Sequence, residues 1–179
     1  MKHTFLDLGM QPIANKFLQE ADEDEYKFNL TVEFDDETKL VSLGNFVRPE
    51  LMFNDSYVYH SSNSDTMRKH FKDYSDLLKR DFDPQKVLEI GICHIQDLED
   101  AFNAVYECIT DNGVFVFEDP SLIRMLERVS YDQIYDEHAH IFSVTALQNL
   151  LNRSGLEIFR VENLDVHGGS NRIYACKQG

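Results

Sequence analysis

Two short apolar segments with a helical pattern between them most constrain how this chain can fold. Residues 86–91 and 114–119 are apolar runs of strand length, and residues 96–110 place apolar side chains three and four positions apart. A strand, a helix and a strand in this order form a βαβ unit. We therefore predict an α/β fold for the centre of the chain.

Further periodic segments flank this unit. Residues 28–34 alternate apolar and polar side chains, and residues 40–43 return as the second strand of a hairpin. The other predicted elements are a helix capped by Ser64, a short helix starting at Pro120, a helix capped by Ser143 and two final strands, at residues 64–80, 120–129, 143–153, 156–162 and 171–176. We expect a small N-terminal β-rich subdomain at residues 1–62 and a second domain at residues 63–179.

The charge and the cysteines exclude several classes of protein. The 179 residues include 32 acidic and 17 basic side chains, a formal net charge of −15, so neither nucleic acid nor an anionic membrane is an expected partner. The three cysteines are too widely spaced for a disulfide framework or a Cys-x-x-Cys knuckle. No apolar run is long enough to span a bilayer and no signal peptide opens the chain, so we expect a cytoplasmic protein.

Histidines gather where predicted loops leave the strands, which is where α/β sheets bind ligands. His94 follows the first strand of the central unit, and His138, His140 and His167 lie in two later loops. Glu137 beside His138 predicts a carboxylate that tunes an imidazole base. A polar loop without a catalytic duty is one alternative, and a metal site on His94, His138 and His140 is another.

Two other segments carry groups that bind small molecules. Glu89 and Gly91 end the first strand as in nucleotide-binding sheets, but the residues after them do not form a longer glycine-rich turn. Residues 57–64 are rich in hydroxyl groups, which donate hydrogen bonds to sugars and carboxylates. An ordinary loop before the next helix is the alternative.

Four segments together form a longer pattern. They are residues 6–15 (LDLGMQPIAN), 57–62 (YVYHSS), 134–143 (IYDEHAHIFS) and 166–172 (VHGGSNR). In this order they resemble the S-adenosylmethionine-dependent C-methyltransferases of nucleotide-activated deoxysugars. The resemblance implies that residues 63–179 form a shortened Rossmann-like methyltransferase sheet with helices.

The resemblance also implies roles for particular residues. Members of the family remove a proton next to the ketone of a dTDP-linked 4-keto-deoxysugar and methylate the resulting carbanion. By this resemblance His138 is the base, Glu137 is its partner, and His94 and Tyr59 are catalytic residues that hold or polarise the sugar. The remaining implied positions are substrate-binding at Tyr135, Tyr57, His167 and Gly168 and cofactor-binding at Glu89 and Gly91.

The chain also departs from the family pattern. The family's N-terminal region carries a zinc site made of two Cys-x-x-Cys pairs, but Asp35 and Thr38 stand where the second pair would be, so we expect no zinc. After Gly91 the family's glycine-rich turn, its acidic ribose ligand and at least one βαβ unit are missing. S-adenosylmethionine is thus the implied cofactor, with much of its binding half lost.

Two functions follow as expectations. The first is a sugar C-methyltransferase that is impaired because much of its cofactor half is missing. The second is a non-catalytic nucleotide-sugar-binding domain, or a subunit that a partner completes. In either case a strand at residues 87–91 pairs with residues 114–119, and the loss of its former neighbours leaves an exposed edge through which the chain self-associates.

Overall fold

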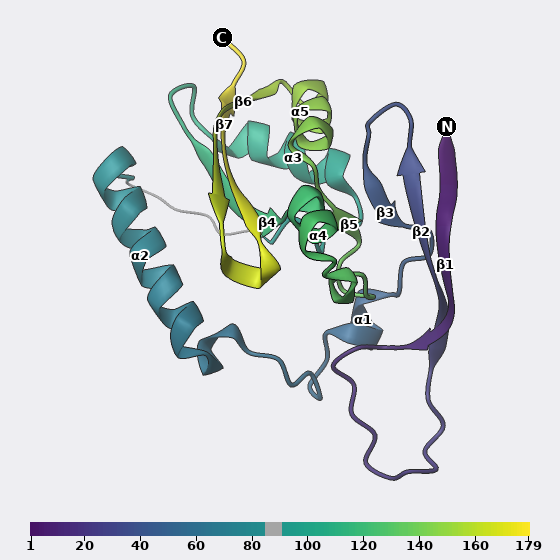
Figure 1. Ribbon diagram of the computed structural model, residues 1–179. Coiled ribbons are helices and arrows are strands. Elements are labelled where there is room, and N and C mark those ends of the chain that lie inside the picture. Colours follow the sequence, from purple (N-terminus) through teal and green to yellow (C-terminus); the bar gives the residue numbers. More distant parts are fainter. Residues whose placement is uncertain (85–90) are drawn as a thin grey trace.

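The computed structural model describes residues 1–84 and 91–179 as a mixed α/β protein (Figure 1). The strands are β1 Lys2–Pro12, β2 Lys27–Asp35, β3 Val41–Leu43, β4 Phe115–Pro120, β5 His140–Ile141, β6 Leu156–Leu164 and β7 Ser170–Lys177. The helices are α1 Pro49–Met52, α2 Asp65–Phe82, α3 Leu98–Cys108, α4 Leu122–Arg128 and α5 Val144–Arg153, with 3-10 turns η1 Ser61–Asn63, η2 Tyr131–Gln133 and η3 Val166–Gly168. The predicted α/β class is confirmed in this general form.

Within the described residues the strands form two sheets. The N-terminal sheet has the order β1-β2-β3-β5, and the C-terminal sheet has the order β4-β7-β6. The predicted strand at residues 87–91 falls almost entirely outside the described residues, so its pairing with β4 stays a prediction. No helix of the described chain is long and apolar enough to cross a membrane.

The N-terminal sheet contains the predicted hairpin of β2 and β3. Val32 pairs with Leu43 and Phe34 with Val41 in antiparallel register, and the side chains of Val32, Val41 and Leu43 are buried. The strand β1 was not predicted because its apolar alternation is broken. Its register against β2 shifts twice, and Gly9 has a positive φ of 70° at the second shift.

The two-residue strand β5 connects the N-terminal sheet to the second half of the chain. Val41 pairs with Ile141, and the backbone N–H of Leu43 donates to the carbonyl of Ala139 at 2.9 Å. The chain therefore crosses the predicted boundary at residue 62 to complete the sheet. This pairing fixes the end of the loop that carries Glu137 and His138.

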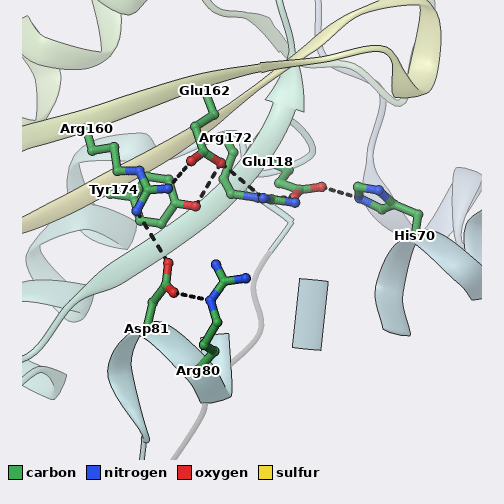
Figure 2. A network of polar contacts seen from close by, with 8 residues as sticks. All are labelled: His70, Arg80, Asp81, Glu118, Arg160, Glu162, Arg172 and Tyr174. Atoms are coloured by element: carbon green, nitrogen blue, oxygen red, sulfur yellow. Dashed lines mark hydrogen bonds and ion pairs between the residues drawn. The ribbon is translucent and has the colours of Figure 1, made fainter. Parts of the chain in front are cut away.

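In the C-terminal sheet, β7 lies between β4 and β6 and is antiparallel to both. Because side chains alternate along a strand, each strand presents two different faces. Phe117 of β4 and Ile173 of β7 pack into a core with α3 and α5. Their neighbours Glu118 and Arg172 point to the opposite face, on the side where α2 lies (Figures 1 and 2).

The helix α2 begins as predicted, because the hydroxyl of Ser64 accepts a hydrogen bond from the backbone N–H of Met67 at 3.3 Å. The apolar side chains predicted to line one face of α2 are only partly buried. Met67 is buried, but Phe71 is 40% exposed. Contact with the C-terminal sheet includes polar pairs, such as His70 with Glu118 at 2.5 Å (Figure 2).

The other helices follow the predicted caps with one correction. The hydroxyl of Ser143 accepts from the N–H of Ala146 at 3.1 Å and starts α5 as predicted. The carboxylate of Asp97, which was not predicted as a cap, accepts from the N–H of Asp100 at 3.0 Å and starts α3. The prediction that Pro120 starts α4 is wrong. This proline ends β4, where its missing N–H is tolerated at the edge of the described strands, and α4 begins two residues later.

Candidate functional site

The loop between η2 and β5 places an oriented imidazole against a phenol. Nδ1 of His138 lies 2.9 Å from the carbonyl oxygen of Gln133, and Nε2 lies 3.1 Å from the hydroxyl of Tyr135. A carbonyl oxygen can only accept, so Nδ1 carries the proton and Nε2 has the free lone pair. The hydroxyl of Tyr135 therefore donates to Nε2, and the two rings lie 4.3 Å apart between centroids.

The protonation state of His138 follows from its surroundings. Its side chain is 8% exposed. Burial, partly offset by the hydrogen bond to Gln133 and reinforced by His94 and His167, lowers the pKa of His138 to about 4. The imidazole is therefore neutral at neutral pH, which is the form that accepts a proton.

Glu137 does not pair with His138, contrary to the predicted carboxylate–imidazole pair. Oε1 accepts from the side-chain amide of Asn15 at 2.7 Å, and Oε2 accepts from the hydroxyl of Tyr57 at 2.7 Å. A turn closed by the N–H of His138 and the carbonyl of Tyr135 sends the two side chains in different directions. Burial, followed by the hydrogen bond to Glu137, raises the pKa of Tyr57, so its phenol stays protonated.

His94 reaches the same place from the loop before α3. Its Nδ1 lies 2.8 Å from the backbone carbonyl of Glu137, and its ring centroid lies 5.4 Å from that of His138. The preceding Cys93 is buried, and its backbone N–H donates to Oδ1 of Asp119 at 3.0 Å. The structure thus brings the predicted residues His94, Tyr135 and His138 together and adds the thiol of Cys93 to them.

The alternative metal site on His94, His138 and His140 is not the group of ligands that the structure brings together. Among the described residues, the group of potential ligands in close geometry is Cys93, His94 and His138, whose ligand atoms lie within 4.8 Å of one another. His140 is not in this group. It belongs to β5, and its Nε2 lies 3.3 Å from the carbonyl oxygen of Gln96.

The predicted catalytic residue Tyr59 and the predicted substrate-binding residues His167 and Gly168 lie outside this cluster. Tyr59 is 48% exposed, and its hydroxyl makes no hydrogen bond to the cluster in the described part of the chain. His167 and Gly168 contribute backbone rather than side chains, since the amide of Gln133 donates to the carbonyl of His167 at 3.1 Å. Gly168 has a φ of 73°, and a Cβ atom there would lie 3.3 Å from the same amide, so this turn supports the residue that orients His138.

Sequence reasoning missed Asn15, Gln133 and Cys93. Asn15 was the last residue of the first recognised segment, so the pattern contained it without a role. Gln133 acts through its backbone carbonyl, and no side-chain pattern reveals that. Cys93 carried a signal only as the neighbour of His94.

The predicted cofactor positions lie at the edge of the described residues. Glu89 lies outside the described residues, and Gly91 is followed by Ile92 and Cys93, both of which are buried in the core. The N–H of Cys93 is already bonded to Asp119. The N–H of Ile95 is likewise bonded to the carbonyl of Ile92, so these two backbone amides are not free to bind a nucleotide.

Comparison with known proteins first defines the class. Residues 87–161 match a family model described as "Methyltransferase domain". This part of the chain is therefore similar to methyltransferases, in agreement with the resemblance that the motifs predicted. It is also similar to a particular relative, the C-methyltransferase NovU of Streptomyces niveus, with 35% identity over 83 residues. That match covers 46% of this chain but 20% of the relative, so the chain spans about one fifth of that protein's length.

A second family model concerns zinc. Residues 1–53 match a model described as "Putative zinc binding domain", which stands against the prediction of no zinc. The three cysteines are Cys93, Cys108 and Cys176, so this region contains none. All of residues 1–53 are described, and none of them belongs to a group of potential metal ligands. The residues present in this region do not fit a cysteine zinc site.

Proposed function

We propose that this chain forms the sugar-binding side of a C-methyltransferase that acts on a dTDP-linked 4-keto-deoxysugar. In this proposal His138 is the base that removes the proton next to the ketone. The observation that carries it is the imidazole of His138, which is buried, neutral and oriented by Gln133 so that Nε2 offers a lone pair beside the hydroxyl of Tyr135. The substrate class rests on the sequence resemblance and on the similarity to a C-methyltransferase.

The proton transfer uses groups of this chain. The C–H proton moves to Nε2 of His138, and the electron pair that it leaves forms an enolate on the sugar. For this transfer the hydroxyl of Tyr135 first leaves Nε2, which frees the lone pair, and the hydroxyl then donates to the developing oxyanion. The ring of His94, whose Nδ1 lies 2.8 Å from the carbonyl oxygen of Glu137, lies 5.4 Å from that of His138 and would hold the sugar beside it.

Other predicted residues take supporting roles in this proposal. Glu137 is a positioning residue, because its carboxylate is held by Asn15 and Tyr57 and anchors the loop of His138. The exposed hydroxyl of Tyr59 is available to bind the sugar. The turn at His167 and Gly168 holds the side chain of Gln133, whose backbone carbonyl orients His138.

Methyl transfer, unlike proton abstraction, needs a bound cofactor. In methyltransferases of this class S-adenosylmethionine supplies the methyl group when it is bound. Because the N–H of Cys93, just after the predicted cofactor strand, is already bonded to Asp119, we propose that methyl transfer by this chain is impaired while proton abstraction is retained.

The arrangement of the domains is also part of the proposal. We assign residues 1–62 to the N-terminal subdomain and residues 63–179 to a shortened Rossmann-like sheet in which residues 87–91 pair with β4. The position of β4 at the edge of the described strands of its sheet supports this pairing. The strand that then forms the edge would pair with a second copy of the chain.

Deuterium exchange tests the base without needing the cofactor. The chain is incubated in D₂O with a dTDP-linked 4-keto-deoxysugar, and NMR follows loss of the proton next to the ketone. We expect wild-type protein to catalyse exchange and His138→Ala to reduce the rate by about 100-fold or more. His3→Ala, which changes an exposed histidine of the N-terminal sheet, is the control and should exchange like wild type. Unchanged exchange in a folded His138→Ala variant would remove the proposed base.

One observation favours the second candidate function, a non-catalytic nucleotide-sugar-binding domain. The N–H of Cys93, directly after the predicted cofactor strand, is bonded to buried Asp119 instead of facing a ligand. Calorimetric titration with S-adenosylmethionine and with the sugar nucleotide separately distinguishes the two functions. Sugar binding without cofactor binding and without deuterium exchange supports the binding domain, whereas tight cofactor binding contradicts it.

A further inference from the structure

We propose that Cys93, His94 and His138 form a binding site for a zinc-like divalent metal ion. One thiol and two imidazoles bring their ligand atoms within 4.8 Å of one another in the described chain. This site is unrelated to residues 1–53, where the zinc-binding family model matches but cysteine is lacking. The inference goes beyond the proposed function and does not depend on it.

The hydrogen bonds of the two imidazoles already resemble those of metal ligands. Metal-bound histidines usually donate their second ring N–H to a carbonyl or carboxylate, which fixes the tautomer and the ring orientation. Nδ1 of His94 lies 2.8 Å from the carbonyl oxygen of Glu137, and Nδ1 of His138 lies 2.9 Å from that of Gln133. Both neutral rings therefore carry the proton on Nδ1, so the lone pair that a metal would bind is on Nε2.

The third ligand is fixed by its backbone. The N–H of Cys93 donates to Asp119 at 3.0 Å, and the Cys93 side chain lies next to His94 in sequence and close to His138 in space. Metal binding displaces the thiol proton to solvent and forms a sulfur–metal bond. Cys93 and His138 are buried while His94 is exposed, so the ion would enter from the side of His94.

The ligand set selects the class of ion. Thiolate and imidazole suit zinc and similar borderline metals, whereas magnesium and calcium prefer oxygen. Around a tetrahedral zinc ion, such ligands lie about 3.3–3.6 Å from one another, so the three side chains would close slightly on binding. Three protein ligands leave a fourth position open to water or to a sugar oxygen.

A metal ion on Nε2 of His138 would exclude both the hydrogen bond from Tyr135 and the use of His138 as a base. Nε2 of His138 accepts from Tyr135 in the described structure, and a bound ion would replace that hydrogen bond. The same lone pair cannot hold a metal and accept a proton. Zinc should therefore inhibit any proton abstraction by His138.

Cobalt titration tests the site directly. Protein treated with a chelator and then dialysed is titrated with Co²⁺, a spectroscopic substitute for Zn²⁺. We expect one ion per chain, visible bands of a four- or five-coordinate site, and a near-ultraviolet charge-transfer band from thiolate to cobalt that Zn²⁺ abolishes. Absence of saturable binding in the wild-type protein would overturn the proposal.

Matched variants identify the ligands. Cys93→Ser should lose the charge-transfer band, whereas Cys108→Ser, which changes an exposed cysteine of α3, should keep it. Since Cys93 is buried, the exposed His94 provides a variant less prone to misfolding, and His94→Ala should weaken binding by about 10- to 100-fold. A band that survives Cys93→Ser, or wild-type affinity in His94→Ala, contradicts the assignment.

Tyr135→Phe separates metal binding from a general effect on the loop. Removing the hydroxyl frees Nε2 of His138, so Co²⁺ should bind at least as tightly as to the wild type. Weaker binding would show that His138 is not the ligand proposed. The cobalt assay contains no sugar and the deuterium assay is done with chelator present, so failure of either proposal is visible separately.

Discussion

Glu137 shows how a single buried carboxylate organises the candidate site. Glu137 is 3% exposed. Its Oε1 accepts a hydrogen bond from the side-chain amide of Asn15, and its Oε2 accepts one from the hydroxyl of Tyr57. A buried charge is costly unless such donors are present. Glu137 thus connects residues 6–15 and 57–62 to residues 134–143, and Asp136 adds a bond from the N–H of Ala14 at 2.9 Å.

Removal of the phenol of Tyr57 should therefore destabilise the protein. Tyr57→Phe leaves Oε2 of Glu137 without its donor, and we expect the free energy of unfolding to fall by about 1–3 kcal/mol. Urea denaturation followed by circular dichroism measures this change. Tyr59→Phe is the matched control, because Tyr59 is exposed, and its effect should stay within about 0.5 kcal/mol. Equal losses in the two variants would refute the role given to Tyr57.

At the scale of elements, a polar network covers the face of the C-terminal sheet toward α2 (Figure 2). Arg172 of β7 lies between two carboxylates, with Nε 2.6 Å from Glu118 of β4 and Nη1 3.2 Å from Glu162 of β6. Its guanidinium also lies 4.6 Å from the ring centroid of Tyr74 in α2. Arg172 therefore both links the three strands of the sheet and contacts α2.

The charge of Glu162 couples this network to pH. Burial raises its pKa, but hydrogen bonds from Arg160 and Tyr174 outweigh burial, and the net pKa lies below the ordinary 4.5. A carboxyl whose pKa is lower in the folded state stabilises the protein above its unfolded pKa, and this contribution disappears as the pH falls through the folded pKa. Acid should thus weaken the contact between the three strands of this network.

Acid unfolding of Glu162→Gln tests this coupling. Between about pH 5 and pH 3 the free energy of unfolding of the wild type should fall more steeply than that of Glu162→Gln. Denaturant unfolding at a series of pH values gives both slopes. Glu107→Gln, in an exposed position of α3, should retain the wild-type slope. Parallel slopes for wild type and Glu162→Gln would contradict the prediction.

At the scale of the whole molecule, the net charge of −15 is the dominant electrostatic property. Like charges repel one another within the folded protein, and salt screens this repulsion over a distance of about 10 Å at 0.1 M. Acidic side chains also gather locally, since Asp22, Glu23 and Asp24 are consecutive and all exposed. Screening should therefore favour the folded state even though it also weakens exposed ion pairs, which contribute little.

We expect the Tm to rise when NaCl is increased from about 0.01 to 0.2 M. The double variant Asp22→Asn/Asp24→Asn should have a higher Tm than wild type at low salt and a smaller response to NaCl. Differential scanning calorimetry measures both effects, with glucose at equal osmolality as an uncharged control. A Tm that falls with NaCl would show that ion pairs outweigh the overall repulsion.

Local patterns predicted much of the secondary structure. The hairpin of β2 and β3, the caps Ser64 and Ser143 and the strands β4, β6 and β7 were all expected from sequence. Each of these depends on alternation, capping or turn residues within about a dozen positions of chain, and such signals are readable without the fold.

The sequence predicted which residues form the candidate site better than it predicted their hydrogen-bond partners. Tyr57, His94, Tyr135, Glu137 and His138 were named in advance, and the structure places them in one hydrogen-bonded neighbourhood. Their partners were not predictable from spacing. Asn15 and Tyr57 lie 122 and 80 positions from Glu137, and Gln133 contributes a backbone atom.

By itself, therefore, the sequence determined the local elements, the acidic character and the relationship to methyltransferases. Tertiary structure alone decided that β5 completes the N-terminal sheet, that Glu137 turns away from His138 and that Cys93 joins the two histidines. The physical reason is that helices and turns follow from neighbouring residues, whereas buried hydrogen bonds are chosen among all the donors that folding brings within reach.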